Sequence, residues 1–198
     1  MFKALQKLFG SKYDRDVKLY SPQVSEINSY YDAHQSLSND GLRNKTLEFR
    51  ERISQHLEGI DQDIEELAKS ASAEEDMSTK EDIYRQLDEA KKERDKHLED
   101  ILKELLPDAF AVVKETARRF TNNTEIRVTA TEQDKNIAAK KNHITIDGAD
   151  AIFSNTWTAA GGEITWNMIH YDVQLIGCLL YTSPSPRDQR GSRMPSSA

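Results

Sequence analysis

The stretch whose side chains are best suited to bind a ligand covers residues 166–177, with the sequence WNMIHYDVQLIG. It places an aromatic ring (Tyr171), a carboxylate (Asp172) and a side-chain amide (Gln174) close together. An amide can donate to one edge atom of a purine and accept from another, while a ring offers a stacking face. The segment therefore fits an adenine pocket. It also fits a core helix with a buried tyrosine and a hydrogen-bonded glutamine, and the residue types alone favour that plainer interpretation.

Two long helices are predicted upstream of this segment. Apolar residues recur every three or four positions in two runs, which is typical of helices that share a narrow seam. A small, polar and acidic stretch at residues 70–79 separates the runs and predicts a loop. We therefore expect an antiparallel helical hairpin with solvated, charged flanks. The seam residues are Phe49, Ile53, Leu57, Ile60, Ile64 and Leu67 in the first run, and Ile83, Leu87, Ala90, Leu98, Ile101 and Leu105 in the second.

Three helix starts are marked by capping residues or prolines. Ser21 precedes Pro22, which predicts an N-cap followed by proline at the first helical position. Ser38 predicts a second N-cap, with Gly41 at the third helical position. Pro107 predicts that a separate helix begins there and extends to Phe120.

Alternating apolar residues downstream predict strands at residues 125–131 and 143–147, with a third over residues 151–157. Gly161 and Gly162 predict a turn before the candidate adenine-binding segment at residues 166–177. Together these features predict a small antiparallel sheet, so the fold class is mainly α with a small β element (α+β).

Composition narrows the classes of function. The chain has 198 residues and a net charge of −7, which argues against nucleic acid as a partner of the whole surface. Its single cysteine, Cys178, excludes an internal disulfide or a cysteine-based metal site. No apolar run reaches the ~18 residues of a membrane-spanning helix. The charged N-terminus does not resemble a secretory signal, so a cytosolic start is expected.

Residues 1–9 predict a short amphipathic helix that ends at Gly10. A helix this short needs a surface to order it, and that surface could be anionic lipid or the chain's own domain. The candidate contact residues are Phe2, Lys3, Leu5, Lys7, Leu8 and Phe9.

Three ordered stretches resemble the SecA family, the ATPase motors of bacterial protein export. HYDVQLIG (residues 170–177) resembles the family's HFDVQLxGG segment, which precedes the phosphate-binding loop. LSNDGLRNKTLEFRERI (residues 37–53) and LLPDAFAVVKETARRF (residues 105–120) match the same family in the same order.

The resemblance implies the N-terminal part of a RecA-like P-loop nucleotide-binding domain. In its terms, residues 1–58 supply the amphipathic helix and scaffold helices, and residues 59–104 form a helical hairpin insertion. Residues 105–177 begin the nucleotide-binding domain, with a β insertion at residues 121–165. Both insertions depart from typical family members.

The resemblance also implies a site and partners. Gln174 would read the adenine of ATP, Tyr171 would be the neighbouring ring and Met168 the apolar wall. ATP, as Mg-ATP in the full-length enzyme, would be the cofactor, while preproteins, the SecYEG channel and anionic phospholipid would be the partners. Homodimerisation stays open. The implied location is the cytoplasm and the cytoplasmic face of the bacterial inner membrane.

The match ends at Gly177, and no G-x-x-x-x-G-K-[ST] phosphate loop occurs anywhere in the chain. The following CLLYTSPSPRD resembles a translated sequencing-library adapter, so residues 178–198 are expected to be a disordered, non-native tail. We expect no catalytic or metal-binding residue in this fragment and no ATP hydrolysis by it alone. The alternative is a non-enzymatic module whose helical hairpin binds a partner protein.

Overall fold

The computed structural model describes residues 12–182. The predicted amphipathic helix with Phe2, Lys3, Leu5, Lys7, Leu8 and Phe9 therefore lies outside the described residues, as does the tail from residue 183 onward.

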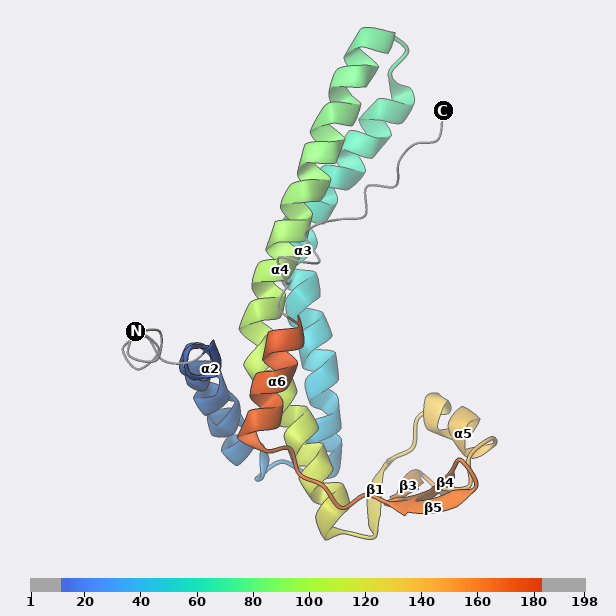
Figure 1. The fold of residues 1–198 in the computed structure, drawn as a ribbon. Helices are drawn as coiled ribbons and strands as arrows, with labels where there is room; N and C mark the ends of the chain where they lie inside the picture. Colours follow the sequence, from blue (N-terminus) through green and yellow to red (C-terminus); the bar gives the residue numbers. More distant parts are fainter. Residues whose placement is uncertain (1–11, 183–198) are drawn as a thin grey trace, which may run out of the picture.

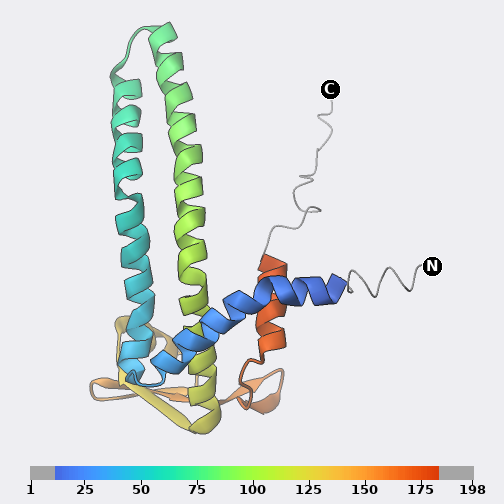
Figure 2. The same cartoon turned by 90° about the vertical axis from the view of Figure 1, so that its left-hand side faces the viewer.

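An antiparallel pair of long helices, α3 (Asn39–Ala73) and α4 (Met77–Asn122), forms the predicted hairpin (Figure 1). Leu57, Leu87 and Ile101 are buried in the seam, while the flanking charged residues are mostly exposed. The loop between the helices, at residues 74–76, is shorter than predicted. The hairpin prediction is confirmed, and its long end projects away from the remaining elements (Figures 1 and 2).

The starts of both hairpin helices are capped by side chains. Ser38 is the N-cap of α3, and its hydroxyl oxygen accepts a hydrogen bond from the Gly41 N–H at 2.9 Å. The Asp76 carboxylate accepts from the Thr79 N–H at the start of α4. The cap predicted at Ser38 is therefore confirmed, and both caps satisfy backbone donors that the helix itself leaves free.

Both prolines lie inside helices, so the predicted starts at Pro22 and Pro107 are wrong. Helix α2 (Lys12–His34) runs through Pro22, and α4 runs through Pro107. An internal proline costs about 3 kcal/mol in an exposed helix. Packing offsets this cost here, because Val24 and Ile27 bury one face of α2, and Pro107 is itself buried.

Helix α2 lies across α4 and contacts the last helix, α6 (Asp172–Thr182) (Figure 2). The core between the three helices consists of Val24, Ile27, Ala111, Leu175 and Leu179. Since α6 continues to Thr182 and buries Leu179, the disorder predicted from Cys178 onward is wrong for the first five residues of that segment.

Beyond α4 the chain forms two small antiparallel sheets. The strands β1 (Glu125–Thr129), β3 (Asp150–Ser154) and β2 (Ile144–Asp147) pair in that order, with Ile126 opposite Phe153 and Ile144 also opposite Phe153. The hairpin of β4 (Thr156–Ala159) and β5 (Gly162–Thr165) makes the second sheet. The antiparallel β element is confirmed, although one predicted strand over residues 151–157 is two strands in the structure.

The turn before the candidate adenine-binding segment is centred one residue earlier than predicted. Ala160 and Gly161 have φ values of 51° and 81°, and Gly162 already belongs to β5. Two positive φ values suit a tight hairpin turn whose twist matches the strands.

The start of α3 is tied to the three-stranded sheet by polar side chains. Asp40 accepts hydrogen bonds from the backbone N–H and the hydroxyl of Thr129, each at 2.9 Å. Arg43 donates to the Thr129 carbonyl oxygen at 3.2 Å and to Asp134 at 2.8 Å. Asp134 lies in α5 (Glu132–Ala138), a short helix that was not predicted, and forms a capping box with Thr131.

Asp134 should make folding stability depend on acid. The Arg43 guanidinium lowers its pKa from 3.8 to about 2; burial opposes the shift, and the Thr131 N–H and hydroxyl assist it. A depressed pKa contributes stability that is present above pH 3.8 and is lost as the pH falls through about 2. Asp134→Asn should therefore lower the free energy of unfolding by about 2 kcal/mol at pH 7, as urea titrations would measure.

The difference between wild type and Asp134→Asn should shrink steadily below pH 4 and vanish near pH 2. Asp147→Asn is the control, because Asp147 also pairs with an arginine on the same sheet but is 65% exposed. It should change stability by less than about 0.5 kcal/mol. A pH-independent loss in Asp134→Asn would contradict the role of the ionised carboxylate.

No helix among residues 12–182 is long and apolar enough to cross a membrane.

Candidate functional site

The predicted site lies where the chain leaves β5 and enters α6. Residues 166–171 connect the two elements without regular secondary structure, and Tyr171 immediately precedes the first residue of α6. Asp172 and Gln174 thus belong to the first turn of α6. The fold therefore places the predicted amide at a helix start, not in the middle of a core helix.

The structure brings Met168, Tyr171 and Gln174 together. The Gln174 Oε1 accepts a hydrogen bond from the Tyr171 backbone N–H at 2.8 Å, and its Nε2 lies 3.8 Å from the Met168 Sδ. This is the return half of a capping box, in which the third helical residue satisfies the N–H of the residue before the helix. In this arrangement both ends of the amide have local partners.

Tyr171 and Gln174 lie at the surface. The Tyr171 residue is 71% exposed, and Gln174 is exposed beside it. The buried face of α6 instead consists of Leu175 and Leu179. The plainer interpretation of a buried tyrosine on a core helix is therefore wrong, because Tyr171 and Gln174 are both accessible.

The first turn of α6 is fastened to the other helices through Asp172. Its Oδ1 accepts from the Asn28 Nδ2 at 3.1 Å and pairs with the Lys114 Nζ at 3.4 Å. Lys114 also donates to the Asn28 Oδ1 at 2.7 Å and lies 5.0 Å from the centre of the Tyr31 ring. Asn28 and Lys114 were missed from the sequence, since nothing local indicates a contact between residues 58 or more positions apart.

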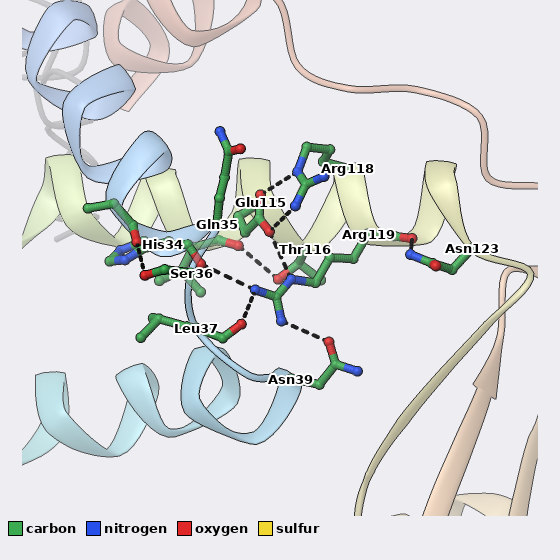
Figure 3. A network of polar contacts seen from close by, with 12 residues as sticks. His34, Gln35, Ser36, Leu37, Asn39, Glu115, Thr116, Arg118, Arg119 and Asn123 are labelled. Atoms are coloured by element: carbon green, nitrogen blue, oxygen red, sulfur yellow. Dashed lines mark hydrogen bonds and ion pairs between the residues drawn. The ribbon is translucent and has the colours of Figure 1, made fainter.

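A larger polar network sits at the base of the hairpin, where α2, α3 and α4 meet (Figure 3). The Arg119 guanidinium donates to Glu115 at 2.8 Å, to the Leu37 carbonyl oxygen at 2.7 Å and to the Asn39 side chain at 2.8 Å. It also donates to the carbonyl oxygen of His34, the last residue of α2, at 3.2 Å.

Glu115 is completely buried and accepts from both Arg118 and Arg119. Burial alone would raise the pKa of Glu115, but the hydrogen bonds and charges of the two arginines bring that pKa below its ordinary value. The carboxylate therefore stays ionised, and the network orients the elements that carry the site.

An open, mainly apolar pocket of about 520 Å³ lies beside the segment. Its wall includes Trp157, Trp166 and His170 together with one face of the end of α4. Met168, Tyr171 and Gln174 are outside this wall, so the pocket does not coincide with the predicted adenine contact. Within the described part of the chain, no three His, Cys, Asp or Glu side chains are grouped for a metal ion.

Comparison with models of known protein families gives a match over most of the chain. A family model described as "SecA DEAD-like domain" matches residues 5–185. This defines the chain's class as a DEAD-like domain. The chain belongs to the SecA family, which confirms the resemblance read from the three sequence stretches.

Similar curated proteins carry the name "Protein translocase subunit SecA". The one from Flavobacterium psychrophilum is 44% identical over 173 residues, covering 87% of this chain and 16% of the relative. That from Christiangramia forsetii is 43% identical over the same length and coverage. The Cytophaga hutchinsonii protein is 42% identical over 179 residues, or 89% of this chain and 16% of the relative. The chain thus spans about a sixth of these relatives, and no solved structure matches it.

Proposed function

We propose that this chain supplies the adenine contact of an ATP-driven motor for protein translocation. The observation that carries the proposal is the accessible amide of Gln174, which is held by the backbone N–H of the exposed Tyr171 and lies 3.8 Å from the Met168 sulfur. Membership of the SecA family supports it, because the relatives are named as translocase subunits.

The chemistry of the three side chains suits adenine. A glutamine amide can accept from the exocyclic amine of adenine while donating to the adjacent ring nitrogen. The exposed phenol ring offers a face for stacking, and a thioether makes favourable contacts with aromatic rings. Guanine presents an acceptor in place of the amine, so the same amide discriminates between the two purines.

Base binding must compete with a bond that already exists. The Gln174 Oε1 is engaged by the Tyr171 N–H, so an incoming adenine has to displace that bond or share the oxygen. The net gain is then a fraction of a fresh hydrogen bond, about 1 kcal/mol or less. The chain contains no phosphate loop, so we expect weak nucleotide binding and no ATP turnover by the chain alone.

The test is made in a full-length background. Residues 12–177 of this chain would replace the matching segment of the Flavobacterium psychrophilum relative, and ATP-dependent turnover would be measured with and without Gln174→Ala. Because the net gain from the Gln174 contact is about 1 kcal/mol or less, half-maximal turnover should need up to about fivefold more ATP.

The same substitution at Gln133, an exposed residue of α5, is the control and should leave the ATP requirement unchanged. Circular dichroism should show the same helix content in both variants. An unaltered ATP requirement in Gln174→Ala would refute the adenine contact.

The proposal extends to the whole protein. In it, residues 1–9 contact anionic phospholipid and the SecYEG channel, Mg-ATP is the cofactor and preproteins are the cargo. The motor then works at the cytoplasmic face of the inner membrane. Residues 59–104 and 121–165 are insertions of this proposed domain. Family membership argues against a non-enzymatic module as a description of the whole chain.

A further inference from the structure

Trp166 has a contact that neither the family resemblance nor the adenine proposal uses. Its indole Nε1 donates a hydrogen bond to the Met168 carbonyl oxygen at 2.8 Å. The Thr121 hydroxyl, near the end of α4, lies 3.2 Å from the same oxygen. Met168 is the residue whose sulfur touches the Gln174 amide. A line of contacts therefore runs from the end of α4 and from Trp166 to the base-reading side chain.

Trp166 is itself fixed by Asn155, a buried residue between β3 and β4. The Asn155 carbonyl oxygen accepts from the Trp166 N–H at 2.8 Å, and the Asn155 side-chain amide donates to the Phe120 carbonyl oxygen at 3.1 Å. Its backbone N–H donates to the Thr124 carbonyl oxygen at 2.9 Å. Asn155 thus connects the last turn of α4, the sheets and Trp166 through one side chain and its backbone.

We propose that Trp166 is a positioning residue for the purine contact, and that the β element at residues 121–165 holds it in place through Asn155. The inference rests on the proposed adenine contact and gives the β element a task in it. Residues 166–171 lack regular structure, so without these bonds they would sample many conformations. Fixing the Met168 carbonyl in advance lowers the ordering cost that base binding would otherwise incur.

The first experiment needs no nucleotide. Trp166→Phe keeps an aromatic ring but removes the indole N–H, so the Met168 carbonyl loses one of its two donors. Exchange of the Tyr171 amide, whose N–H donates to the Gln174 Oε1, should then become roughly tenfold faster in the free chain, while exchange in α3 stays unchanged. Trp157→Phe is the matched control. The ring centres of Trp157 and Trp166 lie 6.4 Å apart, but the indole N–H of Trp157 donates no hydrogen bond to another described residue. Unchanged exchange in Trp166→Phe would overturn the proposal.

The second experiment separates positioning from general destabilisation. Binding of AMP and of GMP to the chain would be measured by ligand-observed NMR. Trp166→Phe should weaken AMP binding about two- to fivefold and leave GMP binding unchanged, because only the adenine contact depends on the positioned segment. An equal loss for both nucleotides would indicate a merely structural role and overturn the inference.

Gln174→Ala distinguishes this inference from the proposed function. If wild type and Gln174→Ala bind AMP equally, or if wild type does not prefer AMP over GMP, the adenine contact is wrong. The hydrogen-exchange result for Trp166→Phe then still decides whether Trp166 orders residues 167–171. If Gln174→Ala loses AMP while Trp166→Phe does not, the adenine contact stands and the positioning role falls.

Discussion

Replacing Arg119 with alanine should lower the free energy of unfolding by about 3–5 kcal/mol, the largest effect we expect from any single substitution in this chain. The change would remove three hydrogen bonds that join α4 to the end of α2, the following loop and the start of α3, and a fourth that Arg119 donates to Glu115 within α4. It would leave the fully buried Glu115 with one arginine in place of two. Urea unfolding followed by far-ultraviolet circular dichroism would measure the loss.

Arg118→Ala is the control for charge alone. Arg118 binds the same Glu115 carboxylate, but its side chain is 27% exposed, compared with 10% for Arg119. Its loss should cost about 1–2 kcal/mol, because Arg119 still neutralises the carboxylate. Equal losses in the two variants would mean that the bonds from Arg119 to Leu37, His34 and Asn39 contribute nothing.

Leu175→Ala should have the second-largest effect, a loss of about 2–4 kcal/mol. Leu175 is 2% exposed and packs in the core that α6 shares with α2 and α4. Truncating it removes apolar contacts and leaves a cavity that the neighbouring Ile27 and Ala111 cannot fill without moving. Urea unfolding would measure the loss, and hydrogen exchange should show that α6 opens more readily than α3.

Val173→Ala is the matched control, because Val173 lies in the same helix but is 63% exposed. It should change the free energy of unfolding by less than about 0.5 kcal/mol. If Leu175→Ala were as mild as the control, α6 would not be docked through this side chain. The placement of Gln174, one residue earlier, would then need another explanation.

Local signals in the sequence predicted the elements that depend on local physics. The apolar spacing identified the hairpin seam, the Ser38 hydroxyl marked the start of α3, and alternation identified the three-stranded sheet. Thr131 and Asp134 form a capping box at the start of α5, which is a local signal for a helix. The helix was not predicted because the stretch is short and polar.

The prolines show where local rules fail. Pro107 predicts a helix start, yet Asp108 accepts from His34 at 2.5 Å and pairs with Lys45 at 3.0 Å, both from other helices. These distant partners hold α4 continuous through the proline. No periodicity or motif reveals them, since each pair depends on how whole elements pack.

The candidate site divides in the same way. Resemblance to a family motif identified Met168, Tyr171 and Gln174 as candidates. The capping geometry of Gln174 follows from its position three residues after Tyr171. The contacts that hold the segment come from the tertiary fold and were not predictable from spacing. Examples are the ion pair of Lys114 with Asp172 and the hydrogen bond from the Trp166 N–H to the Asn155 carbonyl oxygen.

The shape of the hairpin has a mechanical consequence. Helix α3 has 35 residues, so at 1.5 Å per residue it extends about 52 Å from its anchored start. Anchored at Asn39, Asp40 and Arg43, it acts as a lever whose fulcrum adjoins the sheet. A tilt of roughly 5° at that fulcrum would sweep the far end through about 4–5 Å. A small change of angle near the base is thereby magnified into a displacement of several ångströms at the loop that joins α3 and α4.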